Sequence, residues 1–243
     1  MMRLFYSTDK SDTSFSITGD DYKHIVKVMR SKRSDHLEVI DGSGWIYTCE
    51  IEDIDRHQIK ALILNKRLKE APSYKLGIAI SPLKNMSRFE WFLEKSVEIG
   101  ITDIFPLICK RTEKKNIKEE RAKRIIQSAM KQSGNVYEPT LHSNIDIATL
   151  SQMTGWGTKY LAYINNESNS LLATRKFLNP HILIGIGPEG GFVAEEVEIC
   201  LKEKFTPVSL GNSRLRTETA GIVACQIIKT LHEISHANTI PTT

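Results

Sequence analysis

The chain has 243 residues, of which 40% are hydrophobic and 26% are charged, and its formal net charge is +4. This length suits one large domain or two modest ones, and the composition is that of an ordinary globular protein. No apolar run reaches the length of a membrane span, and residues 1–6 turn polar too soon for a signal peptide. We therefore expect a cytoplasmic protein with no membrane partner.

Residues 1–70 are predicted to form a small β-barrel. Apolar residues alternate at 37–40, 45–51 and 59–64, and the Asp-Gly pair at 41–42 marks a hairpin turn between the first two strands. A short helix is predicted at 20–30, and the polar segment 66–74 is predicted to be a linker. The first domain is thus expected at 1–70 and the second at 75–243.

From residue 75 onward, strands and helices are predicted to alternate. This pattern is typical of an α/β domain with a mostly parallel sheet that helices cover on both faces. The predicted strands are 76–81, 104–109, 160–164, 182–186 and 207–210. The predicted helices, which carry apolar residues at helical spacing, are 85–99, 118–133, 194–203 and 217–234.

Positive charge is concentrated in two segments. Residues 23–33 carry five Lys or Arg residues and no acidic residue, and residues 110–131 carry nine against three Glu residues. Such clusters on an otherwise acidic chain are typical of proteins that bind a phosphate backbone, which favours a nucleic-acid ligand. A solvated helix surface is the alternative interpretation of either cluster.

Cysteine and histidine positions predict no metal site. The four cysteines are scattered without a Cys-x-x-Cys pair, and the seven histidines show no ligand spacing. We expect the cysteines to be reduced, buried thiols.

Two glycine-containing loops near the end of the chain carry the most information. The first reads Gly-Pro-Glu-Gly-Gly-Phe at 187–192, and the second reads Leu-Gly-Asn-Ser-Arg-Leu-Arg-Thr-Glu-Thr-Ala at 210–220. Each follows a predicted strand and leads into a predicted helix, so that backbone N–H groups can approach a ligand closely. Because the loops are only about twenty residues apart, they suggest one cofactor pocket built from both.

Two common nucleotide-binding classes are disfavoured. A dinucleotide-binding domain carries its glycine fingerprint after its first strand, whereas here the strand at 76–81 is followed by Pro82-Leu83-Lys84-Asn85. The chain also lacks the Gly-x-x-x-x-Gly-Lys-Ser/Thr loop of a nucleotide-hydrolysing enzyme.

The two loops resemble the RsmE family of 16S rRNA uridine-N3 methyltransferases, which belongs to the SPOUT class. Other stretches of the chain resemble the same family. They are His24 with residues 28–30, Asp35 with residues 41–44, Lys84 with residues 94–100, and residues 132–134. The resemblance implies a SPOUT-type, trefoil-knotted, mostly parallel sheet domain preceded by a PUA-like β-barrel. It also implies S-adenosyl-L-methionine as the methyl donor, a homodimer, and the small ribosomal subunit as substrate, with uridine 1498 of its 16S rRNA as the target.

This chain departs from the family pattern at two places. Ser213-Arg214-Leu215-Arg216 stands where the family often reads basic-Ile-Leu-Arg, and Asn135 stands where an Arg commonly follows Gln-Ser-Gly. Which basic residues contact RNA or cofactor is therefore open, while the reaction class is not.

The resemblance and the chemistry together assign candidate roles. Arg216 is expected to stabilise negative charge on the uracil oxygens, with a phosphate clamp or an ion pair to Glu218 as the alternative. Glu218 is a candidate base for the N3 proton, although a structural carboxylate at a helix start, with water as the proton acceptor, is the stronger interpretation. The candidate cofactor-binding residues are Ile164, Asn165, Gly187, Glu189, Gly190, Leu210, Gly211 and Leu215.

The RNA-binding candidates come from the two basic clusters, and most should contact phosphate rather than read sequence. They are His24, Arg30, Lys110, Arg111, Lys114, Lys115, Arg121 and Arg124, although His24 is equally compatible with a structural role. Two alternatives stay open: a SPOUT methyltransferase that acts on another rRNA or tRNA nucleotide, and a non-catalytic RNA-binding protein. Product mapping separates the first, and failure to bind S-adenosylmethionine would favour the second.

Overall fold

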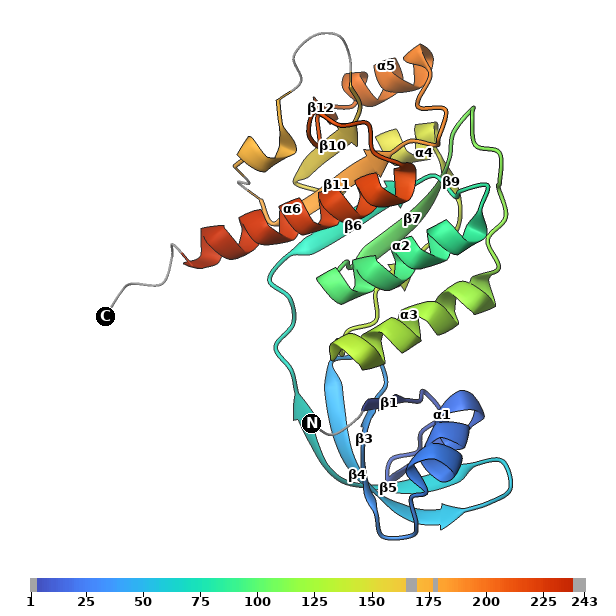
Figure 1. The fold of residues 1–243 in the computed structure, drawn as a ribbon. Coiled ribbons are helices and arrows are strands. Elements are labelled where there is room, and N and C mark those ends of the chain that lie inside the picture. Colours follow the sequence, from blue (N-terminus) through green and yellow to red (C-terminus); the bar gives the residue numbers. More distant parts are fainter. Residues whose placement is uncertain (1–3, 165–169, 177–178, 238–243) are drawn as a thin grey trace. The chain divides into compact units, whose positions relative to one another are not determined.

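The computed structural model describes residues 4–164, 170–176 and 179–237, which form two compact units (Figure 1). The first unit comprises residues 1–71 together with 127–138, and the second comprises 72–126 and 139–243. The first unit therefore takes in a segment that lies well beyond residue 70. None of the helices in the described part combines the length and hydrophobicity that crossing a membrane requires.

The first unit is built on a five-stranded sheet with the order β1-β3-β4-β5-β2. Only β1 and β3 are parallel to each other, and the other neighbours are antiparallel. Alternating residues of these strands, such as Phe15, Leu37 and Ile51, form its hydrophobic core. Its elements are β1 (Leu4–Tyr6), β2 (Ser14–Ile17), α1 (Gly19–Lys23), the π-helix η1 (His24–Met29), β3 (His36–Ile40), β4 (Trp45–Ile54) and β5 (Ile59–Leu68).

The Asp-Gly turn between β3 and β4 makes a contact that requires glycine. Gly44 has a φ of +97°, and its N–H donates to the carbonyl of Val136 at 3.0 Å. A Cβ at Gly44 would lie 2.3 Å from the ring of Tyr137, which no side chain could accept without displacing that ring. The segment 134–138 is packed onto the unit through this turn.

Several elements of this unit differ from the predicted ones. The predicted helix at 20–30 is a short α-helix that continues as a π-helix and ends at Arg30, whose φ is +55°. A segment this short has too few apolar residues for their spacing to distinguish an α-helix from a π-helix. The strands β1 and β2 were not predicted because they are only 3 and 4 residues long. Strand β5 runs on to Leu68, which shortens the predicted linker.

The second unit confirms the predicted α/β class with a parallel sheet. Its strand order is β12-β10-β11-β6-β7-β8, every pair in that order is parallel, and β9 pairs with β7. Its strands are β6 (Lys75–Ile80), β7 (Asp103–Ile108), β8 (Thr140–Leu141), β9 (Ile145–Asp146), β10 (Thr158–Ala162), β11 (His181–Ile186) and β12 (Thr206–Val208). Its helices are α2 (Met86–Ile99), α4 (Ile147–Ser151), the 3₁₀-helix η2 (Leu172–Thr174), α5 (Ala194–Lys202) and α6 (Thr217–Ala237), while α3 (Glu119–Ser133) begins in this unit.

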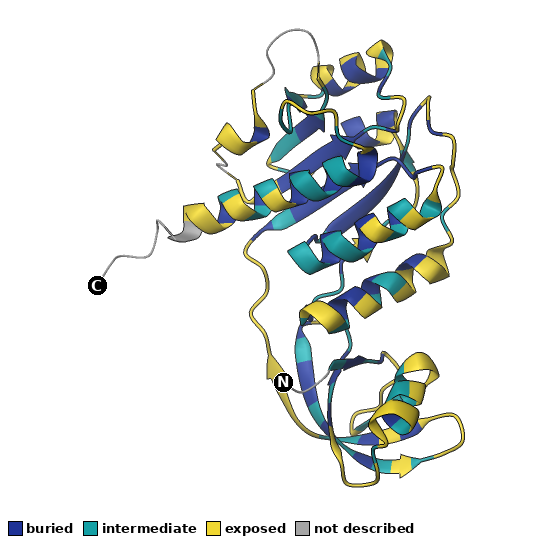
Figure 2. Ribbon diagram, viewed as in Figure 1, coloured by how far each residue is buried: buried dark blue, intermediate teal, exposed yellow. Residues whose placement is uncertain are grey.

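Helices cover both faces of this sheet, so its central strands are buried on both sides (Figure 2). Helices α2 and α6 pack together on one face, where a Cβ at Gly221 would lie 2.7 Å from Phe92. Helices α4 and α5 pack on the other face through residues such as Leu150 and Val197. Helix α2 starts at Met86 because the Asn85 side chain accepts the N–H of Ser87 at 3.0 Å.

The order of the strands brings distant loops to one edge of the sheet. The chain places β11 between β10 and β6, and then moves back across β10 to form β12. Because these strands are parallel, the loops that leave their carboxyl ends meet at a single edge, where ligands of open α/β sheets bind. Both glycine loops leave strands at this edge.

The cysteines confirm the prediction of buried thiols. All four are free and buried, and burial raises the pKa of the Cys49 thiol to about 12 and that of Cys200 to about 11. No group of three or more metal-ligating side chains occurs in the part of the chain that the structure describes.

Candidate active site

A cavity of about 290 Å³ lies at the carboxyl edge of β10 and β11. Its walls are mostly apolar side chains and glycine backbone, supplied by the ends of these strands, by both glycine loops and by the start of α6. The residues that line it are Ala162, Tyr163, Ile164, Ile186, Gly187, Pro188, Glu189, Gly190, Gly191, Phe192, Leu210, Gly211, Ser213, Arg214, Leu215, Thr217 and Ala220.

The first glycine loop turns sharply away from β11. The N–H of Gly191 donates to the carbonyl of Pro188 at 2.8 Å, and Gly191 has a φ of +72°. A side chain would strain the backbone in this conformation, which explains a glycine at this position. The turn leaves the backbone of the loop along one wall of the cavity.

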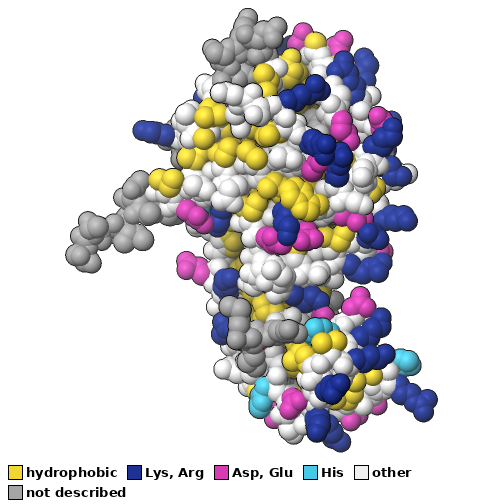
Figure 3. All heavy atoms as spheres, in the orientation of Figure 1, with side chains coloured by type: hydrophobic (Ala, Val, Ile, Leu, Met, Phe, Trp, Pro, Cys, Tyr) yellow, Lys and Arg dark blue, Asp and Glu magenta, His cyan; other side chains and the backbone are white. Residues whose placement is uncertain are grey.

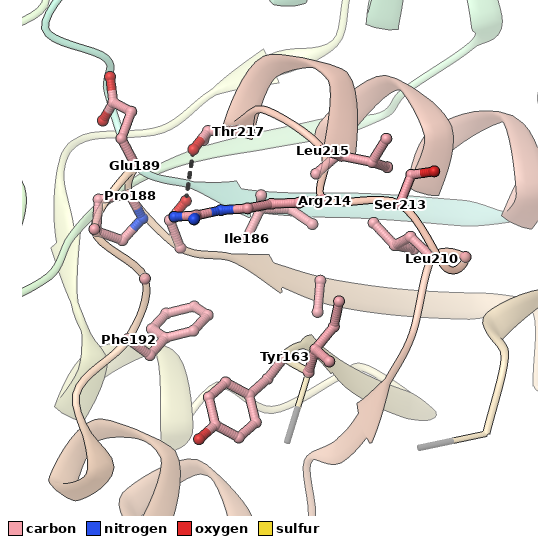
Figure 4. A pocket seen from close by; sticks show the side chains of 17 residues that line it. Tyr163, Ile186, Pro188, Glu189, Phe192, Leu210, Ser213, Arg214, Leu215 and Thr217 are labelled. Carbon is pink, nitrogen blue, oxygen red and sulfur yellow. Dashed lines mark hydrogen bonds between the residues drawn. The ribbon is translucent and has the colours of Figure 1, made fainter. Parts of the chain in front are cut away.

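The second glycine loop is joined to the first by a hydrogen bond. The hydroxyl of Thr217, at the start of α6, donates to the carbonyl of Gly187 at 3.1 Å (Figure 4). Gly211 has a φ of +133°, and its N–H donates to the Ser209 hydroxyl at 3.2 Å. The two loops thus form one continuous site, as their spacing in the sequence suggested.

Buried Glu196 links Val193, the residue that follows the first glycine loop, to the basic loop after β7. Its carboxylate accepts the backbone N–H of Lys110 at 2.7 Å and that of Val193 at 2.9 Å, and only 8% of the residue is exposed. Arg111 adds a second link, because its guanidinium donates to the carbonyl of Gly190 at 2.6 Å. The residues in these contacts therefore include two that the sequence suggested for RNA, Lys110 and Arg111.

Most of the predicted cofactor-binding residues line the cavity. These are Ile164, Gly187, Glu189, Gly190, Leu210, Gly211 and Leu215, while Asn165 lies outside the described residues. The cavity is also lined by residues that were not predicted, namely Tyr163, Phe192, Arg214 and Thr217, of which the last three belong to the two loops. Nothing in the sequence singles out Tyr163 as a cavity residue except its position at the end of a strand.

The two predicted catalytic residues lie beside the cavity. Within the described part of the chain, neither Arg216 nor Glu218 lines it. Arg216 is exposed and directly precedes α6, where its carbonyl accepts the N–H of Ala220 at 2.8 Å. Glu218 is 6% exposed, and its Oε1 lies 3.7 Å from the Nε of Arg88 on α2, whereas its Oε2 has no hydrogen bond among the described residues. This geometry matches the helix-start carboxylate that was the stronger interpretation of Glu218.

The RNA-binding candidates are divided between the two units. In the first unit Arg30 is exposed, and the half-buried ring of His24 lies 6.3 Å from that of Phe5. In the second unit the candidates are exposed residues of α3 and of the loop after β7, and Figure 3 shows basic side chains interspersed with acidic ones on this unit. They are Lys110, Arg111, Lys114, Lys115, Arg121 and Arg124.

Besides Arg111, two of these arginines already have partners within the chain. Arg121 forms a bidentate ion pair with Glu90, and its Nη2 lies 2.7 Å from the Glu90 Oε2. That guanidinium lowers the pKa of Glu90. The Nε of Arg124 donates to the carbonyl of Glu120 at 3.2 Å. Lys114 and Lys115 are exposed side chains of the same basic segment.

Comparison with protein families identifies the kind of enzyme. Residues 69–229 match the model of an RNA methyltransferase domain, and residues 17–64 match that of an RNA methyltransferase PUA domain. The chain belongs to this RNA methyltransferase family. The family resemblance inferred from the glycine loops and the expected PUA domain are thereby confirmed.

Individual relatives extend this match over nearly the whole chain. A ribosomal RNA small subunit methyltransferase E from Buchnera aphidicola subsp. Acyrthosiphon pisum is 30% identical over 241 residues, which cover 94% of this chain and 93% of the relative. A probable rRNA-methyltransferase from Porphyromonas gingivalis has a similar structure, with a TM-score of 0.89, 37% identity, and coverage of 96% of this chain and all of that one. A ribosomal RNA small subunit methyltransferase E from Neisseria gonorrhoeae, solved with bound S-adenosyl methionine, has a TM-score of 0.83, 28% identity, and coverage of 95% and 98%.

Proposed function

We propose that this protein transfers the methyl group of S-adenosylmethionine to N3 of one uridine in the 16S rRNA of the small ribosomal subunit. The observation that carries the proposal is the cavity in which both glycine loops meet, in a chain of an RNA methyltransferase family. The relatives' names support a small-subunit rRNA substrate, and the bound cofactor of the gonococcal enzyme supports the methyl donor. The choice of uridine N3 rests on the resemblance of the two loops to the RsmE family.

The cavity has the properties that an adenosyl group needs. A Cβ at Gly191 or Gly211 would meet no atom within 4 Å, so the backbone at both positions faces open space that a ligand can fill. Leu210 and Leu215 supply apolar walls for the flat adenine ring. When bound, S-adenosylmethionine supplies an electrophilic methyl group on its sulfonium.

The residues at the start of α6 are placed to stabilise the uracil. Neutral N3 must lose its proton before it can accept a methyl group, and negative charge then spreads to the uracil oxygens. We propose that the Arg216 guanidinium and the positive end of the α6 dipole stabilise this charge. Glu218 faces Arg88 rather than the cavity, so we assign the proton to water.

Further features follow from the same resemblance and are part of the proposal. The PUA-like barrel domain would span residues 1–70, the methyltransferase domain would span 75–243, and the latter would contain a trefoil knot. The place of β11 between two strands that precede it in the chain is compatible with such a knot. The enzyme would act as a homodimer in the cytoplasm, with the basic clusters on RNA phosphates and the target uridine unstacked.

Methylation of ribosomal subunits tests this function. Purified protein and labelled S-adenosylmethionine are incubated with small subunits from a strain that lacks the gene, and the modified nucleotide is mapped by mass spectrometry. We expect 3-methyluridine at one position of 16S rRNA. Subunits from the parent strain, which already carry the modification, should accept no label. Label on another nucleotide or on tRNA would overturn the proposed target, and no label despite subunit binding would favour a non-catalytic RNA-binding protein.

A further inference from the structure

Arg214 is the one positively charged side chain among the described residues that line the cavity. Figure 4 shows it extended across the cavity toward Pro188, while the Ser213 hydroxyl points away from it.

The charge of Arg214 is not neutralised within the protein. Among the described residues no carboxylate forms an ion pair with Arg214, whereas Arg88 pairs with Glu218 and Arg121 with Glu90. Glu189 is the other charged residue of the cavity, but its carboxylate accepts the backbone N–H of Lys84 at 3.3 Å and points away from Arg214 (Figure 4). Arg214 is exposed, and its planar guanidinium, which has no carboxylate partner among the described residues, can form a bidentate contact with an anionic ligand group.

The proposed cofactor has one anionic group that meets this requirement. Its sulfonium and its ammonium are cations, which a guanidinium repels, whereas its carboxylate can accept two parallel hydrogen bonds from an arginine. We propose that Arg214 binds the carboxylate at the amino-acid end of S-adenosylmethionine. This assignment rests on the proposed function, and it gives Arg214 a role in cofactor affinity that differs from the role of Arg216 in the reaction.

Ligands that differ in the carboxylate test the assignment. Wild-type protein and Arg214→Met, which keeps an unbranched side chain but removes the charge, are titrated calorimetrically with three ligands. These are S-adenosylmethionine, S-adenosylhomocysteine and 5′-methylthioadenosine, of which the last lacks the whole amino-acid end. We expect the first two to bind about 10- to 100-fold more weakly to the variant, as for loss of a hydrogen bond to a charged group. The affinity for 5′-methylthioadenosine should change less than about threefold.

Two further variants keep the outcome unambiguous. Arg214→Lys retains the charge without the planar donors and should recover part of the affinity, and Arg216→Met should change the affinity for none of the three ligands. If Arg214→Met lowered the affinity for all three ligands equally, the proposal would be overturned. Unchanged affinities with a lower methylation rate would also overturn it, because they would place Arg214 on the RNA. If wild-type protein bound none of the ligands, the proposed function itself would fail.

Discussion

Arg216→Ala should lower kcat for rRNA methylation by about 10²- to 10³-fold, which is the usual effect of removing a group that stabilises a developing oxyanion. Arg216 lies between Leu215 and Thr217, which both line the cavity, and its carbonyl accepts the first-turn N–H of Ala220. Arg216 therefore precedes the positive end of α6 and lies next to the cavity wall, where we propose that it stabilises the uracil. The affinity for S-adenosylmethionine should change little, because the guanidinium is outside the cavity.

Single-turnover rates with saturating subunits, together with cofactor titration, measure both quantities. Arg216→Lys keeps a charge but loses the planar donors, so it should retain part of the rate. Lys202→Ala removes an exposed cation of α5 that lies outside both basic clusters, and it serves as the control for net charge. An equal loss of kcat and cofactor affinity in Arg216→Ala would instead assign Arg216 to cofactor binding. A pure rise in KM for the subunit would make it a phosphate contact.

Glu196→Ala should lower the free energy of unfolding by about 1–3 kcal/mol, because it leaves two partly buried backbone donors without their acceptor. These donors are the N–H groups of Lys110 and Val193. The substitution also releases the first glycine loop from the loop after β7, so the affinity for S-adenosylmethionine should fall as well. Denaturant unfolding and calorimetric titration measure the two effects.

Glu195→Ala is the matched control for this experiment. Glu195 occupies the same first turn of α5 and carries the same charge, but its side chain is exposed. It should lose only the small helix-dipole contribution, about 0.3–1 kcal/mol, and none of the cofactor affinity. Equal effects of the two substitutions would show that the Glu196 bridge does not hold the loop.

The sequence predicted the main architecture because that depends on local patterns. The alternation of strands and helices after residue 75 led to the correct fold class, and the spacing of the glycine loops led to a single cavity. The π-helical turn of η1 and the short strands β1 and β2 were missed because they offer too few residues for a period to appear. Element bounds shifted by a few residues for the same reason.

The roles of individual side chains were harder to predict, since they depend on tertiary contacts. Arg214 and Arg216 are two residues apart in an irregular loop, and no periodic pattern indicates which of them faces the cavity. The surroundings of the Glu218 carboxylate include Arg88, which lies on α2 and is far from Glu218 in the sequence. Arg111 is part of a basic cluster in the sequence, yet in the fold its guanidinium donates to the carbonyl of Gly190.

The central claim is that the cavity between the two glycine loops holds the methyl donor. A crystal structure of the protein with S-adenosylhomocysteine tests it most directly. We expect the nucleoside to lie in this cavity, against the backbone of 187–191 and 211–215, with the adenine beside Leu210 and Leu215. Ligand density at another place on the second unit, with this cavity unchanged, would show that the two loops do not bind the cofactor.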